Sequence, residues 1–137
     1  PEGSSRILFV DDEEQIVQMN EIKLKAMGYT VRTYTDSTDA LKAFRSEPDR
    51  YDLVITDLDM PKLSGDQLAD ELRRIRSDIP IILCTGSSEE ISKKHSGNIQ
   101  ECLKKPVKRQ VLEKAIRLAL NRKRKINNKN QQTEKFF

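Results

Sequence analysis

The sequence has no tryptophan, one histidine and only two cysteines among its 137 residues. Cys84 and Cys102 both lie inside apolar runs, which favours buried, reduced thiols over a disulfide framework. The single histidine, His95, stands alone after two lysines. We therefore expect it to be exposed rather than to bind a metal.

Long apolar runs are also missing. No run approaches the roughly 20 residues that a membrane-spanning helix needs, and the first residues lack the apolar centre of a signal peptide. We expect no membrane segment in this chain. The location that these absences favour is cytoplasmic, either as a free protein or as the cytoplasmic part of a membrane-bound one.

Charge is distributed unevenly along the chain. The net charge is +3, but residues 117–137 contain seven lysines and arginines and one glutamate, so the remaining chain carries −3. The stretch NRKRKINNKNQQTEK has no interleaved aromatic residues, and nucleic-acid binding by this domain alone is not expected. We predict that residues 1–5 are cloning-derived or linker residues, that one domain spans 6–121, and that 122–137 form a basic, disordered tail or linker.

Apolar runs alternate with helical patterns over the whole domain. Strands are predicted at 6–10, 29–34, 51–56, 80–85 and 99–104, and helices at 13–27, 36–46, 65–75, 87–95 and 108–124. Near-continuous apolar strands are typical of a parallel sheet that is covered on both faces. The fold class is therefore α/β: a doubly wound (βα)5 three-layer sandwich, with five parallel strands in the flavodoxin-like order 2-1-3-4-5.

Polar side chains follow four of the predicted strands. Asp11 and Asp12 follow the first, Asp57 ends the third, and the fourth and fifth lead into Thr85 and Lys105. Because the carboxyl ends of parallel strands lie at one edge of a sheet, these groups should converge there. Three carboxylates repel one another unless a cation neutralises them, and oxygen ligands of this kind suit Mg²⁺, with Mn²⁺ as an alternative. Helix capping would account for one such aspartate, but not for the whole set.

The motifs VDDEE, DLDMPKLSG, CTG and KKP, in this order, resemble the receiver domain of two-component response regulators, over residues 6–121. The resemblance implies that Asp57 is the phosphoacceptor. It also implies that Asp12 and Asp57 bind Mg²⁺ directly together with the backbone carbonyl of Asp59, whereas Asp11 acts through water.

The resemblance assigns further roles on the other strands. Thr85 would be the switch hydroxyl, and Lys105 would pair with the phosphoryl group, its peptide bond to Pro106 being cis. Gly86 would leave room for the phosphate. Asp59 and Ser87 occupy the positions where the family tunes the lifetime of the phosphorylated state.

One position departs from the family pattern. Cys102 stands where receivers usually have Tyr or Phe in the fifth strand. No bulky ring can then follow Thr85 inward, so we expect the switch to be weak or differently transmitted.

The resemblance implies a signalling function rather than an enzyme. A histidine kinase or its phosphotransfer domain would donate the phosphoryl group, and the domain would release it slowly. The usual partner face, and a possible dimer face, is formed by helix 87–95, strand 99–104 and helix 108–124. The parent protein could be a stand-alone receiver, a receiver with a following output domain, or a hybrid histidine kinase. The stretches DLVITDLDMPKLSG and IPIILCTG resemble the receivers of hybrid histidine kinases.

Two alternatives belong to other classes. ITDLDM resembles the Asp-x-Asp motif of haloacid-dehalogenase-type phosphatases, although that motif opens their domain and their paired acids lie downstream. An unphosphorylated, receiver-like binding module is the other alternative, which the occupation of every chemical position disfavours.

Overall fold

A computed structural model describes residues 4–93 and 99–134. The strands are β1 (Arg6–Val10), β2 (Thr30–Tyr34), β3 (Leu53–Asp57), β4 (Ile81–Thr85) and β5 (Glu101–Lys104). The helices are α1 (Glu14–Ala26), α2 (Ser37–Ser46), α3 (Gly65–Ile75), α4 (Ser88–Ser92) and α5 (Arg109–Glu134), with a short 3-10 turn, η1 (Pro48–Arg50), before β3.

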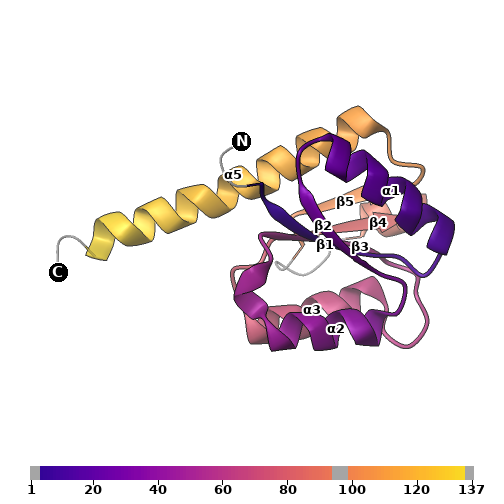
Figure 1. Cartoon of the computed structure of the whole chain (residues 1–137), viewed down its shortest axis with the longest axis horizontal. Helices are drawn as coiled ribbons and strands as arrows, with labels where there is room; N and C mark the ends of the chain where they lie inside the picture. The colour runs from indigo at the N-terminus through magenta and orange to yellow at the C-terminus, as the bar shows by residue number, and fades with distance from the viewer. Residues whose placement is uncertain (1–3, 94–98, 135–137) are drawn as a thin grey trace.

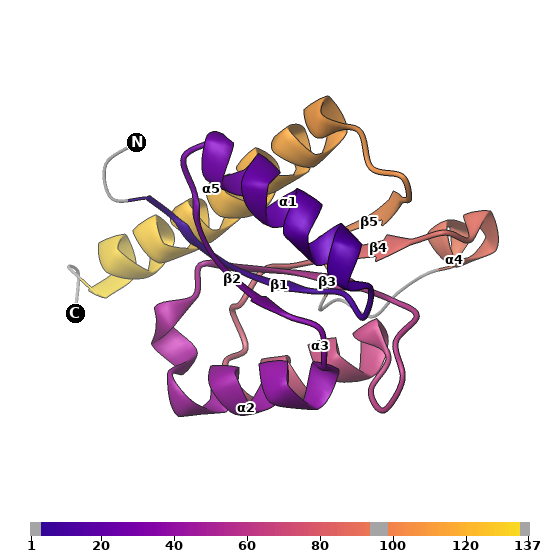
Figure 2. The same cartoon turned by 45° about the vertical axis from the view of Figure 1, so that its right-hand side comes forward.

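The strands form one parallel sheet in the order β2-β1-β3-β4-β5, which confirms the predicted topology. Helices α1 and α5 cover one face of the sheet, and α2 and α3 cover the other (Figures 1 and 2). β3 and β4 are buried along their whole length. Since both faces of these strands are covered, an apolar side chain is stabilised at every position, which explains why the runs do not alternate.

The core consists of two apolar clusters, one on each face of the sheet. The first packs α1 and α5 onto the sheet through residues such as Leu24, Ile55 and Ile116. The second packs α2 and α3 through residues such as Phe44 and Leu72. Together they hold the strand ends in fixed register, which is what the site at the carboxyl edge requires.

The ends of α4 and α5 differ from prediction by more than one residue. α5 continues to Glu134 rather than ending near residue 124, and the added stretch has only Ile126 as an apolar residue, with lysine and glutamine, which favour helix, among its polar residues. α4 ends at Ser92, and the remainder of its predicted span partly lies outside the described residues. Val111 of α5 is apolar but 46% exposed.

None of the helices, in the ranges that the structure describes, combines the length and the apolar character needed to cross a membrane.

Gly65, the first residue of α3, generates a testable prediction. A Cβ there would lie 2.8 Å from Leu83 Cδ2 and 2.9 Å from Leu58 Cα, and against the backbone oxygen of Asp57. We expect Gly65→Ala to lower the free energy of unfolding by about 1–3 kcal/mol, measured by urea denaturation. Gly86→Ala is the control, because its Cβ would meet no atom within 4 Å. Equal stability of the two variants would contradict the close packing at Gly65.

Candidate functional site

Three aspartates meet at the carboxyl edge of the sheet. Asp11 and Asp12 follow β1, Asp57 ends the neighbouring β3, and each offers a carboxylate oxygen within 4.8 Å of the others. Asp11 and Asp57 are buried, whereas Asp12 is exposed. The predicted convergence of the strand ends therefore holds for these acids.

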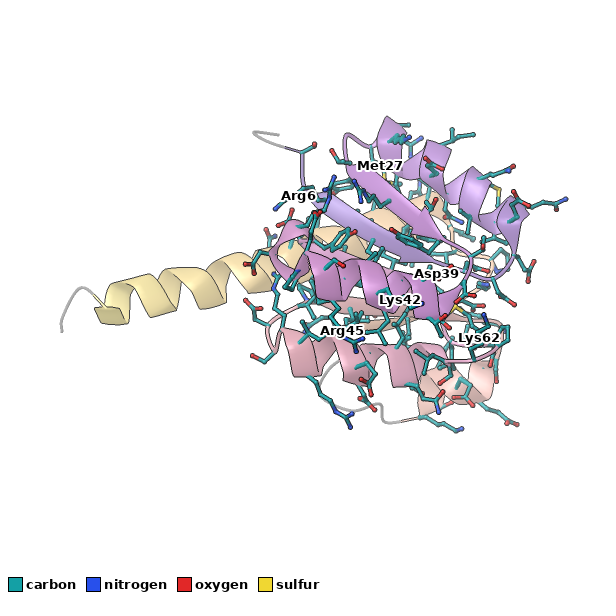
Figure 3. The ribbon with its side chains drawn as sticks, turned by 60° about the horizontal axis from the view of Figure 1, so that its bottom comes forward. Arg6, Met27, Asp39, Lys42, Arg45 and Lys62 are labelled. Atoms are coloured by element: carbon teal, nitrogen blue, oxygen red, sulfur yellow. The ribbon has the colours of Figure 1, made fainter. Side chains whose placement is uncertain are left out.

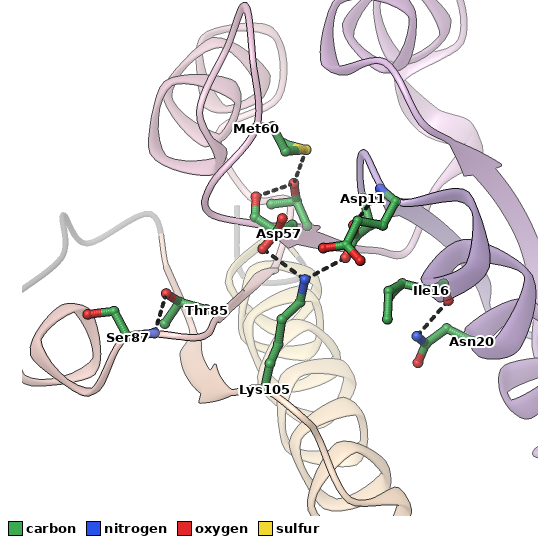
Figure 4. Close-up of polar contacts among 10 residues, drawn as sticks. Asp11, Ile16, Asn20, Asp57, Met60, Thr85, Ser87 and Lys105 are labelled. Carbon is green, nitrogen blue, oxygen red and sulfur yellow. Dashed lines mark hydrogen bonds and ion pairs between the residues drawn. The ribbon is translucent and has the colours of Figure 1, made fainter.

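Lys105 enters the same pocket from the turn after β5 (Figure 4). Its Nζ atom donates to Asp11 Oδ2 at 2.8 Å and lies 3.2 Å from Asp57 Oδ1. The other oxygen of Asp11, Oδ1, accepts from the backbone N–H of Glu13 at 2.9 Å. One lysine thus bridges two buried carboxylates of the three-acid cluster.

The charge balance changes how Asp57 titrates. Burial, together with the negative charge of Asp11, raises the pKa of Asp57 from its ordinary value of 3.8 to about 6, although Lys105 acts in the opposite direction. Burial alone would lower the pKa of Lys105, but its contacts with Asp11 and Asp57 raise it overall. A cation bound beside Asp57 would favour the charged carboxylate.

Thr85 ends β4, next to β3, but its hydroxyl is not turned toward Asp57. The Thr85 hydroxyl oxygen accepts from the backbone N–H of Ser87 at 3.1 Å (Figure 4). Ser87 in turn caps α4 by accepting from Glu90 N. The side chain predicted as the switch is therefore buried and directed toward α4 in this structure.

The two cysteines lie on opposite faces of the sheet. Cys84 faces the α1–α5 side, and burial raises the pKa of its thiol to about 12, which makes it a poor nucleophile. Cys102 is paired in register with Leu83 and is half-buried on the other face. In the turn after β5, the peptide bond between Lys105 and Pro106 is cis.

A cavity that the sequence did not predict opens beside the acids. It has a volume of about 410 Å³ and extends from Asp57 and Lys105 past Cys84 toward α1 and the start of α5. Met19 lines it and is 51% exposed, and the nearby Ile22 of α1 is 72% exposed. These residues look like core positions in the helical pattern, and only their placement on the sheet reveals them as surface.

The family comparison identifies the class of protein. The model of the response regulator receiver domain matches residues 7–117. The chain belongs to this family. The match speaks against the haloacid-dehalogenase alternative.

Individual relatives agree with this assignment. The probable transcriptional regulator ycf27 of Porphyridium aerugineum is 37% identical over 128 residues, which cover 91% of this chain and 52% of that protein. The receiver domain protein of Clostridium thermocellum is 35% identical with a TM-score of 0.84, over 89% of this chain and 98% of that one. TrrA from Thermotoga maritima, solved with Mg²⁺-BeF, is 36% identical with a TM-score of 0.77, over 85% and 99%. The chain spans about half or less of the curated regulators that it matches.

Receiver domains bind Mg²⁺ at an acidic pocket, and the residues present here fit such an ion. The donors are carboxylate oxygens from three acids that lie close enough to share one cation. One of the acids is exposed, which leaves an open side for water ligands. These oxygen ligands are therefore of the kind that binds a hard divalent cation.

The raised pKa of Asp57 leads to a pH-dependent prediction. Since the folded, metal-free state holds this proton more tightly than the unfolded state, ionisation of Asp57 between pH 4 and 6 destabilises the fold. Asp57→Asn removes that ionisation. We expect the variant to be more stable by about 1–3 kcal/mol at pH 8 in EDTA, with the gain shrinking as pH falls from 6 to 4.

Urea denaturation at several pH values checks this expectation. The exposed Asp49 provides the control, because Asp49→Asn should not reproduce the pH dependence. A stability difference between Asp57→Asn and the unsubstituted protein that stays constant across pH would contradict it.

Proposed function

We propose that Asp57 accepts a phosphoryl group from a phosphohistidine, so that this domain is the phosphoacceptor of a two-component phosphorelay. The observation that carries the proposal is the position of Asp57. Its carboxylate ends a fully buried strand, with two further acids in reach and Lys105 Nζ at 3.2 Å.

The chemistry follows from the groups around that carboxylate. An Asp57 oxygen attacks phosphorus and the P–N bond to the donor breaks. The donor imidazole, already protonated on its other ring nitrogen, takes the electron pair of that bond and leaves as the neutral ring. Lys105 exchanges one carboxylate contact for a phosphoryl oxygen and neutralises part of the added charge. Thr85 turns from Ser87 N toward another phosphoryl oxygen. Asp12, Asp57 and the backbone carbonyl of Asp59 would hold the Mg²⁺, with Asp11 acting through water, and the ion would reduce the repulsion between carboxylate and phosphoryl group.

The side of the pocket at α1 suits the approach of the donor. Met19 and Ile22 expose apolar surface there, and the cavity connects that surface with Asp57. We propose that a histidine kinase, or its phosphotransfer domain, docks on this side. Lys23 of the same helix also lines the cavity and adds a positive charge to it.

The output would pass through the face formed by α4, β5 and α5. Phosphorylation draws Thr85 away from Ser87, which alters the N-terminal turn of α4. Cys102 lies under this face and is smaller than an aromatic ring, so the coupling should be weaker than in receivers with Tyr or Phe. The same face is the proposed surface for a homodimer.

The parent protein is proposed to act in the cytoplasm. Its curated relatives include transcriptional regulators, which favours an additional DNA-binding effector domain outside this chain. A hybrid histidine kinase is the alternative parent, and Asp57 would accept the phosphoryl group in either case.

Phosphorylation with a small donor tests the proposal. Incubation with acetyl phosphate and Mg²⁺ should add one phosphoryl mass, and hydroxylamine should release it. Asp57→Asn should abolish the adduct, whereas Asp59→Asn should retain it because only the Asp59 backbone is used. Intact-mass spectrometry measures the adduct in the original protein and in both variants. An adduct that persists in Asp57→Asn would refute the assignment, and continuous turnover of acetyl phosphate without an adduct would favour a phosphatase.

A further inference from the structure

The loop between β3 and α3, residues 58–64, is closed at its base. The backbone N–H of Leu58 donates to Cys84 O, and that of Gly65 donates to Leu58 O, each at 2.8 Å. Met60 is buried, with its sulfur 4.0 Å from the hydroxyl of Thr56. Asp59, whose backbone carbonyl is the proposed metal ligand, lies between these two anchors.

The tip of the loop adopts an unfavourable conformation. Lys62 has a φ of 70°, in the left-handed region that favours glycine. The backbone N–H of Leu63 donates to Pro61 O at 2.9 Å, which makes residues 61–63 a γ-turn. A residue with a side chain stays in such a conformation only when its surroundings hold it there.

Ser37, from the start of α2, supplies that support. Its hydroxyl donates to Pro61 O at 3.2 Å and accepts from Leu63 N at 3.2 Å, so it contacts both ends of the turn. Ser37 is only 2% exposed, and water therefore cannot easily replace these bonds. The N-cap of α2 is a different residue, Asp36, and both of these Ser37 hydroxyl bonds go to the loop.

An ion pair reinforces the same contact from outside. Lys62 Nζ donates to Asp36 Oδ2 at 2.6 Å, and Figure 3 shows Lys62 beside the N-terminal end of α2. This bond is the main reason that the pKa of Asp36 lies well below its ordinary value. Since Lys62 is 61% exposed, salt screens the pair, and the buried hydroxyl is the stronger support.

We propose that Ser37 is a positioning residue for the metal site: it holds the γ-turn at residues 61–63 and thereby fixes the Asp59 carbonyl toward the acidic pocket. The inference rests on the proposed function only in its use of that carbonyl as a ligand. Loss of the hydroxyl leaves the three carboxylates intact. Its effect should therefore be weaker Mg²⁺ binding rather than loss of the phosphoacceptor.

Calorimetric titration with Mg²⁺ provides the first test. We expect Ser37→Ala to weaken Mg²⁺ binding by about 3–10-fold, the effect of one or two buried hydrogen bonds. Ser46→Ala is the matched control, because Ser46 lies in the same helix and its hydroxyl donates to Lys42 O of that helix rather than to the loop. The rate of phosphorylation by acetyl phosphate should fall in Ser37→Ala at low Mg²⁺ and return to the original rate at saturating Mg²⁺.

A second substitution separates positioning from a general effect on α2. Glycine inside a helix lowers helix stability, so Ala43→Gly weakens α2 while it keeps both Ser37 hydroxyl bonds, and its Mg²⁺ affinity should stay within about twofold of the original protein. Equal weakening in Ala43→Gly and Ser37→Ala would mean that Ser37 acts through α2 stability, and equal affinity in Ser37→Ala and the original protein would also overturn the proposal. If the original protein binds Mg²⁺ but takes up no phosphoryl group, the proposed function fails while the affinity ratios still decide the role of Ser37.

Discussion

The mutual repulsion of Asp11, Asp12 and Asp57 is the constraint on which the rest of this domain depends. The pairing of β1 with β3 places the ends of these strands side by side, so the acids cannot move apart without loss of sheet register. Lys105 spans Asp11 and Asp57 and offsets part of the repulsion. The remaining negative charge is available to a divalent cation and, with it, to the phosphoryl group.

The surrounding structure keeps this unfavourable cluster in place. Apolar clusters on both faces fix the strands, and Gly65 allows α3 to begin directly against Asp57. The loop that follows Asp57 is held at its base by backbone hydrogen bonds and at its tip by Ser37. Stability gained in the core thus maintains a site that would not persist by itself.

Sequence reasoning reached the topology and the acidic cluster because both follow from strand order and from the residues at strand ends. It did not reach features that depend on tertiary placement. The exposure of Ile22 and Val111 is decided by the angle at which helices lie on the sheet, and the orientation of the Thr85 hydroxyl by Ser87. Nor does any local pattern link Ser37 to a turn 24 residues further on.

The most direct test of the charge constraint is the stability of the protein as a function of Mg²⁺ at constant ionic strength. Urea denaturation at pH 8 should show the free energy of unfolding rising with Mg²⁺, by about 2.7 kcal/mol at 100 times the dissociation constant. Most of this gain should disappear in Asp57→Asn. An equal gain in both proteins, or none in either, would contradict a cation site built on the repulsion of these three aspartates.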